Sequence, residues 1–193
     1  MRTKTIILII VVIVLGGFGI WSIGRNQTSN VMTTAGWKTY TNSQYNFTFS
    51  APLDFAPTLQ KDALSYMFKC NADDQICLPY VGGQTSDGFE VAALEVQVNA
   101  SSQNCEQTPG DNGQPTQKSI NGVTFHVTQD RQAGLGHRLI TDLYRTYYNS
   151  ACYTIGLNIA SNIGTSDKGL DPIFNTMIHK KLESILSTFK FTK

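Results

Sequence analysis

The amino-terminal segment most limits how this chain can fold. From Thr5 to Gly24 there is no charged side chain, and Ile6 to Leu15 is an unbroken aliphatic run. Twenty helical residues span about 30 Å, which is the thickness of the hydrocarbon core of a bilayer. The segment 5–24 is therefore predicted to be a single transmembrane helix.

The charges around this segment predict its orientation. Arg2 and Lys4 precede it, whereas Arg25 alone follows it. The excess of positive charge places residues 1–4 in the cytoplasm and the rest of the chain outside, as a single-pass protein of the cell membrane. A cleaved signal peptide is the alternative, but its apolar part is usually 7–15 residues long and no small-residue cleavage site follows closely.

Four cysteines follow the apolar segment: Cys70, Cys77, Cys105 and Cys152. An even number on the outer side of a membrane favours two disulfides. The short separation favours Cys70–Cys77, and Cys105–Cys152 then follows by elimination. Zinc is the competing interpretation, but the six residues between Cys70 and Cys77 exceed the usual two to four. We therefore expect no metal site.

The rest of the chain is expected to form a polar tether, residues 25–36, followed by a domain that is rich in strands, residues 37–193. Apolar and polar residues alternate with the period of half-buried strands. The segments that show this pattern are 45–50, 64–70, 123–128 and 151–159. Segment 138–148 is predicted to be a further strand, with aromatic and aliphatic residues on both faces. In 89–98 the apolar positions change parity, which predicts a β-bulge near Ala92 and Ala93.

Turn signals separate these segments. Asn121-Gly122 predicts a tight turn, and a tight hairpin connection is expected within Tyr147-Tyr148-Asn149-Ser150-Ala151. Residues 101–117 are dense in turn-forming residues and are expected to form a loop.

The carboxyl end changes from strand to helix periodicity. Apolar residues recur at helical spacing from Ile173 to Phe189. Asp171 suits the N-cap of this helix and Pro172 its first turn. Many antiparallel strands and one covering helix predict an α+β domain, in which the C-terminal helix lies across an antiparallel β-sheet.

The two ends of the predicted domain carry a recognisable pattern. Trp37 to Asn42 leads into Tyr45-x-Phe47-x-Phe49-x-x-Pro52, and Thr188-Phe189 closes the last helix. These ends resemble bacterial membrane-anchored proteins with a PsbP-like outer domain, in which such a strand and such a helix bracket an antiparallel sheet. Leu53-Asp54-Phe55 departs from the small residue and tryptophan that the family commonly has there. The resemblance implies a non-catalytic binding or accessory module and assigns no catalytic residue.

Catalytic, phosphate-binding and dinucleotide-binding motifs are not found in the sequence, so we expect no cofactor. His126 and His137 would meet at a metal only if their strands paired suitably, and two surface histidines are the simpler interpretation. Ser150, His137 and Asp142 are the residues from which a hydrolase would have to be built. The formal net charge of +1 argues against nucleic-acid binding.

Tyrosines cluster near the predicted hairpin connection. Because neighbours in a strand face opposite sides, some of Tyr144, Tyr147 and Tyr148 are expected to face outward and to contact a glycan or a protein. Cross-strand packing against a covered face is the alternative.

The sequence therefore favours a membrane-anchored extracytoplasmic module, not an enzyme, that binds a protein or cell-envelope partner. A membrane-tethered envelope hydrolase and a pilin-like assembly subunit are the alternatives.

Overall fold

The computed structural model describes residues 36–57, 75–83, 86–100, 105, 112–162 and 170–192. The predicted cytoplasmic start, the transmembrane anchor and nearly all of the tether lie outside these residues, as does the alternating segment 64–70. No helix in the described ranges is long and apolar enough to cross a membrane.

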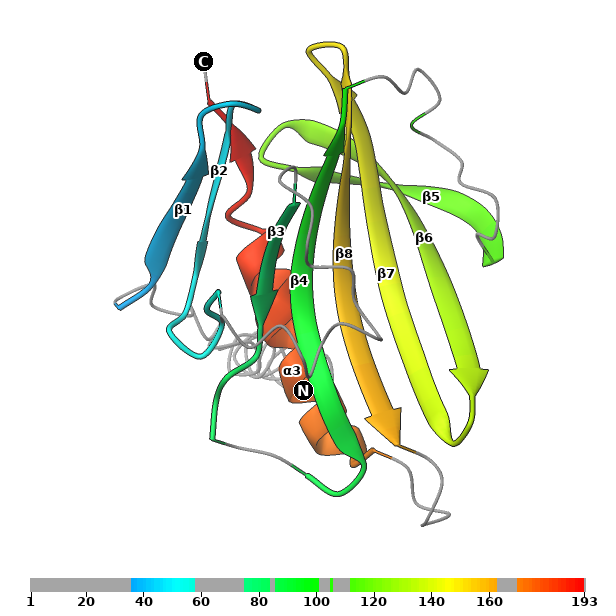
Figure 1. Cartoon of the computed structure of the whole chain (residues 1–193). Helices are drawn as coiled ribbons and strands as arrows, with labels where there is room; N and C mark the ends of the chain where they lie inside the picture. The colour runs from blue at the N-terminus through cyan, green and yellow to red at the C-terminus, as the bar shows by residue number, and fades with distance from the viewer. Residues whose placement is uncertain are drawn as a thin grey trace, which may run out of the picture. The chain divides into compact units, whose positions relative to one another are not determined.

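Six antiparallel strands form the larger sheet, in the order β3-β4-β8-β7-β6-β5 (Figure 1). Their bounds are β3 Gln75–Pro79, β4 Phe89–Asn99, β5 Asn112–Ile120, β6 Val123–Gly134, β7 His137–Tyr148 and β8 Ala151–Asn162. Two-residue turns join β5 to β8 in succession, and every residue of these turns has a positive φ. The turn predicted at Asn121-Gly122 is confirmed, and the predicted hairpin connection lies at Asn149-Ser150.

A second, three-stranded sheet brings the two ends of the domain together. It contains β1 (Lys38–Asn42), β2 (Phe47–Ala51) and β9 (Lys190–Phe191), with β2 in the middle. The Tyr153 hydroxyl donates to the Tyr45 carbonyl at 2.8 Å and so ties this sheet to the larger one.

Helix α3 (Pro172–Leu186) lies against one face of the larger sheet, hereafter the α3 face (Figure 1). Asp171 caps it as predicted, because its side chain accepts the Ile173 N–H at 2.8 Å. The apolar stripe of α3 is buried in one core shared with both sheets. The buried helix residues are Phe174, Ile178, Leu182, Ile185 and Leu186. The predicted antiparallel sheet with a C-terminal helix is thus confirmed.

Two local predictions are wrong. The register of β4 shifts between Phe89 and Val91, so the bulge lies near Glu90 and not at Ala92 and Ala93. The apolar residues of the other parity, Val91 and Ala93, pack in a small second cluster with Ala160 on the sheet's far face.

The second wrong prediction is the end of the loop 101–117. Strand β5 already begins at Asn112, so residues 112–117 belong to a strand. The register of β5 is irregular between Asn112 and Thr116, after which it pairs regularly with β6. Pro115 is tolerated there because β5 is the edge strand of the sheet.

Candidate functional site

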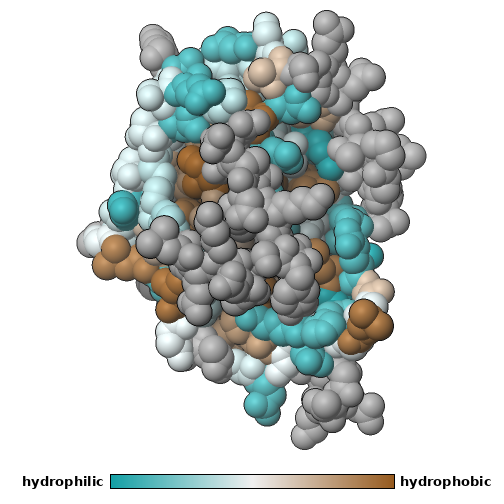
Figure 2. Space-filling view, in the orientation of Figure 1, coloured by the Kyte–Doolittle hydropathy of each residue, from teal (hydrophilic) through white to brown (hydrophobic). Residues whose placement is uncertain are grey.

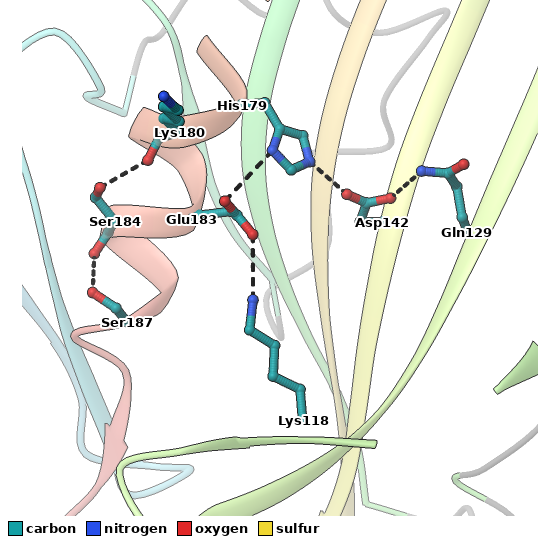
Figure 3. Close-up of polar contacts among 8 residues, drawn as sticks. All are labelled: Lys118, Gln129, Asp142, His179, Lys180, Glu183, Ser184 and Ser187. Carbon is teal, nitrogen blue, oxygen red and sulfur yellow. Dashed lines mark hydrogen bonds and ion pairs between the residues drawn. The ribbon is translucent and has the colours of Figure 1, made fainter. Parts of the chain in front are cut away.

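A chain of polar side chains links α3 to the β5–β7 side of the sheet (Figure 3). We call it the α3 polar network; its members are Lys118, Gln129, Asp142, His179 and Glu183. Gln129 and Asp142 are direct partners on β6 and β7, so both point to the same face of the sheet. His179 and Glu183 are four residues apart on α3, which puts them on one face of the helix.

His179 is the centre of this network. Its Nε2 lies 2.7 Å from Asp142 Oδ2, and its Nδ1 lies 3.7 Å from Glu183 Oε2. The other oxygen of Asp142 accepts a hydrogen bond from Gln129 Nε2 at 2.6 Å. The imidazole is therefore oriented by two carboxylates, one from the sheet and one from its own helix.

Lys118 closes the outer end of the network. Its Nζ donates to Glu183 Oε1 at 3.3 Å and lies 5.5 Å from the centre of the Tyr144 ring. Burial acts to lower the pKa of Lys118, but Tyr144 and Glu183 outweigh it and raise that pKa. Burial raises the pKa of Tyr144, so its phenol stays neutral beside the ammonium group. Because the Lys118–Glu183 pair is well exposed, it contributes at most about 1 kcal/mol to stability.

The network has the chemistry of a brace. An Asp–His pair can orient a general base, but the chemistry also requires a nucleophile within reach. Ser184 and Ser187 donate instead to backbone carbonyls of α3, at 2.7 Å each (Figure 3). The network therefore fastens to the sheet the polar flank of α3 that lies beside the helix's apolar stripe.

Sequence reasoning did not find this network. It grouped Asp142 with His137 and Ser150, which the fold separates. His137 Nδ1 lies 2.6 Å from Glu90 Oε1, whereas Asp142 bonds His179 on the α3 face. The spacing of His179 and Glu183 within a predicted helix was the available signal.

The two histidines that the alternative metal site would have required are not brought together either. His126 lies opposite Arg145 in the middle of the sheet, and His137 lies opposite Asn162 at its end. Among the described residues, no group of three or more His, Cys, Asp or Glu side chains could hold a metal ion.

A second polar cluster occupies the far face of the sheet. Glu95, Asn158 and Thr141 lie on β4, β8 and β7, and the Thr141 hydroxyl donates to Asn158 Oδ1 at 2.7 Å. Burial raises the pKa of Glu95, and the nearby Asn158 amide lowers it in part. The Asn158 side chain also lies over Gly156, where an added Cβ would come within 3.2 Å of its Nδ2. These three side chains thus form a polar cluster on the far face, with Asn158 closely packed at its centre.

The raised pKa of Glu95 predicts a pH-dependent stability. A raised pKa means that the fold favours the protonated Glu95 side chain. The stability that this side chain contributes is fully present below the ordinary pKa of glutamate, and it is lost as the pH rises through the raised pKa of the folded state. Glu95→Gln is therefore expected to be more stable than the native chain at pH 7, and to lose this advantage towards pH 3.5. Urea unfolding across this range measures the difference.

The control is Glu183→Gln, which alters an exposed carboxylate bonded by Lys118 and His179. This variant is not expected to gain stability at pH 7. An advantage of Glu95→Gln that stayed constant at all pH values would show that ionisation of Glu95 is not its cause.

The three tyrosines named from the sequence have different environments. Tyr144 is 3% exposed on the α3 face and packs edge-on against Phe125, so its ring is not available to a partner. Tyr148 is half-buried and stacks on Phe191 at 3.8 Å. Tyr147 faces the far side and is 51% exposed. The expectation of cross-strand packing holds for Tyr144, and partner contact stays a prediction for Tyr147 above all.

The three cysteines that the structure describes are oxidised. Cys105 and Cys152 form a disulfide with a Cα–Cα distance of 5.2 Å, as predicted. Cys77 is also disulfide-bonded. Cys70, which was predicted to be its partner, lies outside the described residues. A disulfide at the start of β8 fits an oxidising compartment.

No protein-family model matches the sequence, and no curated protein is significantly similar to it. Three similar solved structures share 10–12% identity with the chain. A Bacteroides thetaiotaomicron protein matches with 10% identity and a TM-score of 0.49 over 82% of this chain, which spans about half (49%) of that protein.

The other two come from different bacteria. Cyanobacterial PsbP (CyanoP) from Synechocystis matches with 12% identity and a TM-score of 0.37, over 88% of this chain and 98% of its own. PA94, a protein of unknown function from Pseudomonas aeruginosa, matches with 12% identity and a TM-score of 0.41, over 79% and 94%. A PsbP is thus among the solved structures that this chain is similar to.

Proposed function

We propose that this chain is a membrane-anchored, extracytoplasmic, non-catalytic module that binds a protein or cell-envelope partner through a surface centred on Tyr147. The exposure of Tyr147 carries the proposal. Gln97, Asn99 and Gln117 are exposed, uncharged residues on the same face, each two strands away from β7. We call these three residues and Tyr147 the Tyr147 surface; Arg145 and Cys152, which lie between them, are buried.

The composition of this surface suits recognition more than chemistry. A half-exposed tyrosine offers a rigid apolar ring with a polar tip, and such residues often dominate binding energy. Amide side chains on the same face supply both donors and acceptors. The disulfide supports the extracytoplasmic placement, and the charge-free segment 5–24 supports the anchor.

The proposal is tested by placing a photo-crosslinking benzoylphenylalanine at position 147 of the full chain in its native membrane. We expect a discrete adduct from position 147 and none from Lys180, an exposed control position on α3. Tyr147→Ala is expected to weaken partner binding by about tenfold or more, as the loss of an interface aromatic does. Thermal stability should change by less than about 0.5 kcal/mol, because the side chain is half exposed.

A tethered hydrolase remains the second candidate, because the 2.7 Å contact between His179 and Asp142 resembles a base and its orienting acid. The absence of an adduct at position 147, together with hydrolysis of an envelope polymer that His179→Ala abolishes, would reverse the two proposals. An adduct at Lys180 as strong as that at Tyr147 would also count against the Tyr147 surface.

A further inference from the structure

Exposed apolar side chains are unevenly distributed over this domain. Five large ones are exposed among the described residues: Leu53, Val81, Leu135, Tyr147 and Ile173. The proposed function explains the exposure of Tyr147, but it does not explain the exposure of the other four. On the side of the molecule in Figure 2 the apolar colour falls in separate patches amid hydrophilic and intermediate atoms.

Leu135 and Ile173 lie at the same end of the larger sheet. Leu135 is in the turn between β6 and β7, next to the end where His137 pairs with Asn162 of β8. At that same end Phe89 of β4 pairs with Ser161. The Phe89 ring lies 4.9 Å from that of Phe174, which follows Ile173 at the start of α3. Figure 1 shows this turn and the start of α3 on the lower side of the domain.

Leu53 and Val81 lie next to this end. The Val81 N–H donates to the Asp54 carbonyl at 2.8 Å, which places the two apolar residues side by side. The ring of Tyr80, beside Val81, is 6.0 Å from that of Phe89. All four exposed aliphatic residues are therefore near the loops of one end of the fold, which we call the aliphatic end.

The chain also enters the domain at the aliphatic end. Lys38, the first residue of β1, pairs with Ala51, two residues before Leu53. The predicted tether, residues 25–36, therefore joins the domain here. Twelve fully extended residues reach at most about 43 Å. A domain held by this tether keeps its aliphatic end within that distance of its anchor.

Leu135 is the most unusual of the four residues. It is 100% exposed and has a φ of 52°, a backbone conformation that favours Asn or Gly over a bulky side chain. An aliphatic residue there is unfavourable both for the backbone and for its contact with water, so the folded domain alone does not explain it. Two exposed arginines, Arg131 and Arg138, lie on the strands of the same hairpin. An apolar tip flanked by long cationic side chains suits the interface of a bilayer.

We propose that the aliphatic end docks on the lipid bilayer, with Leu135 inserted at the boundary between headgroups and acyl chains. This inference rests on the membrane anchor of the proposed function and deepens it, because it fixes which end of the domain faces the lipid. The Tyr147 surface, at the opposite end of β7, then faces away from the membrane and towards a partner.

The test uses the full chain in phosphatidylcholine liposomes, with a nitroxide attached at Leu135→Cys. No free cysteine among the described residues competes for the label. Collisions with oxygen, which concentrates in lipid, and with a water-soluble nickel chelate report the surroundings of the label. The control is Ser119→Cys, an exposed position on β5 that pairs with Thr124 near the other end of β6. We expect the ratio of oxygen to nickel collisions at position 135 to exceed that of the control by about fivefold or more, as for an inserted side chain.

Leu135→Asn separates docking from folding. Asparagine suits the left-handed backbone of the turn, so this variant is expected to unfold at a higher temperature than the native chain. A nitroxide at Ile173→Cys is nevertheless expected to lose its high oxygen-to-nickel ratio in the Leu135→Asn background. A purely structural role of Leu135 would not produce both changes.

The failures are distinguishable. A chain that an alkaline wash removes from the liposomes lacks the anchor, and the proposed function fails with it. A retained chain whose label at position 135 meets the nickel chelate as freely as the label at Ser119 is anchored but undocked, which overturns the inference. A label shielded from both reagents is covered by protein, a partner or a second copy, and also overturns it.

Discussion

Phe189→Ala is expected to destabilise the domain by about 3–5 kcal/mol, the cost of removing a fully buried aromatic ring. Phe189 is 1% exposed. Its ring packs against Phe47 at 5.5 Å, Phe125 at 5.9 Å and Phe191 at 5.3 Å. These neighbours belong to β2, β6 and β9, so one side chain joins the small sheet to the large one just beyond the end of α3. Its loss would leave a cavity where three elements meet.

Urea unfolding followed by tryptophan or tyrosine fluorescence measures this change. Since a typical domain is stable by only about 5–15 kcal/mol, the variant should lose a large share of its stability. Ile173→Ala is the matched control, because it also truncates an apolar side chain but one that is 82% exposed. It should unfold within about 0.5 kcal/mol of the native chain. Equal effects of the two substitutions would contradict the described core.

Local patterns predicted the elements of this fold well. Hairpin turns depend on two residues, and Asn121-Gly122 and Asn149-Ser150 adopt the positive φ values that such turns need. The cap and first turn of α3 depend on Asp171 and Pro172, and both act as expected. These features are decided by neighbours in sequence, so the sequence alone was sufficient.

The α3 polar network could not be predicted in the same way. His179 and Asp142 are separated by 37 positions, and their contact depends on how α3 crosses the sheet. Spacing shows which residues share a face of an element, but it does not show which faces meet. No role was accordingly assigned to His179 from the sequence, and Asp142 was grouped with the wrong histidine, His137.

Both faces of the larger sheet contain buried side chains, and this explains the errors in β4 and among the tyrosines. In β4, Leu94 and Val96 face α3, whereas Ala93 is equally buried on the far face. The change of parity of the apolar residues in β4 therefore reflects burial on both faces, and it was misinterpreted as a bulge at Ala92 and Ala93. Alternation likewise puts Tyr147 on one face of the sheet and Tyr144 and Tyr148 on the other, but it does not reveal which of these faces α3 covers.

The two proposed surfaces lie at opposite ends of β7. Leu135 precedes this strand and Tyr147 is near its end, twelve residues later. At about 3.3 Å per residue the strand separates them by about 40 Å. If the aliphatic end rests on lipid, the rigid sheet carries the Tyr147 surface that far from the bilayer. The two proposals can therefore be tested independently, because no residue belongs to both surfaces.

Removing the Cys105–Cys152 disulfide is the second change with a large expected effect. The bond closes a loop with a sequence separation of 47, which contains β5, β6 and β7. The entropy of closing such a loop in the unfolded chain predicts a loss of about 4 kcal/mol in the double variant Cys105→Ala, Cys152→Ala. Both residues are buried, and the methyl side chain of alanine places no polar group there. Urea unfolding under oxidising conditions measures the loss.

The urea dependence of this variant identifies where the bond acts. A cross-link that restrains the unfolded chain makes that chain more compact, so its removal should expose more surface on unfolding and increase the m value. Dithiothreitol, added to the double variant, then measures the remaining bond at Cys77 separately. A loss below about 1 kcal/mol with an unchanged m value would contradict the entropic account. In the folded chain, pairing with Asn99 of β4 already holds Cys152 in place. We therefore expect the bond to act mainly by restricting the unfolded chain.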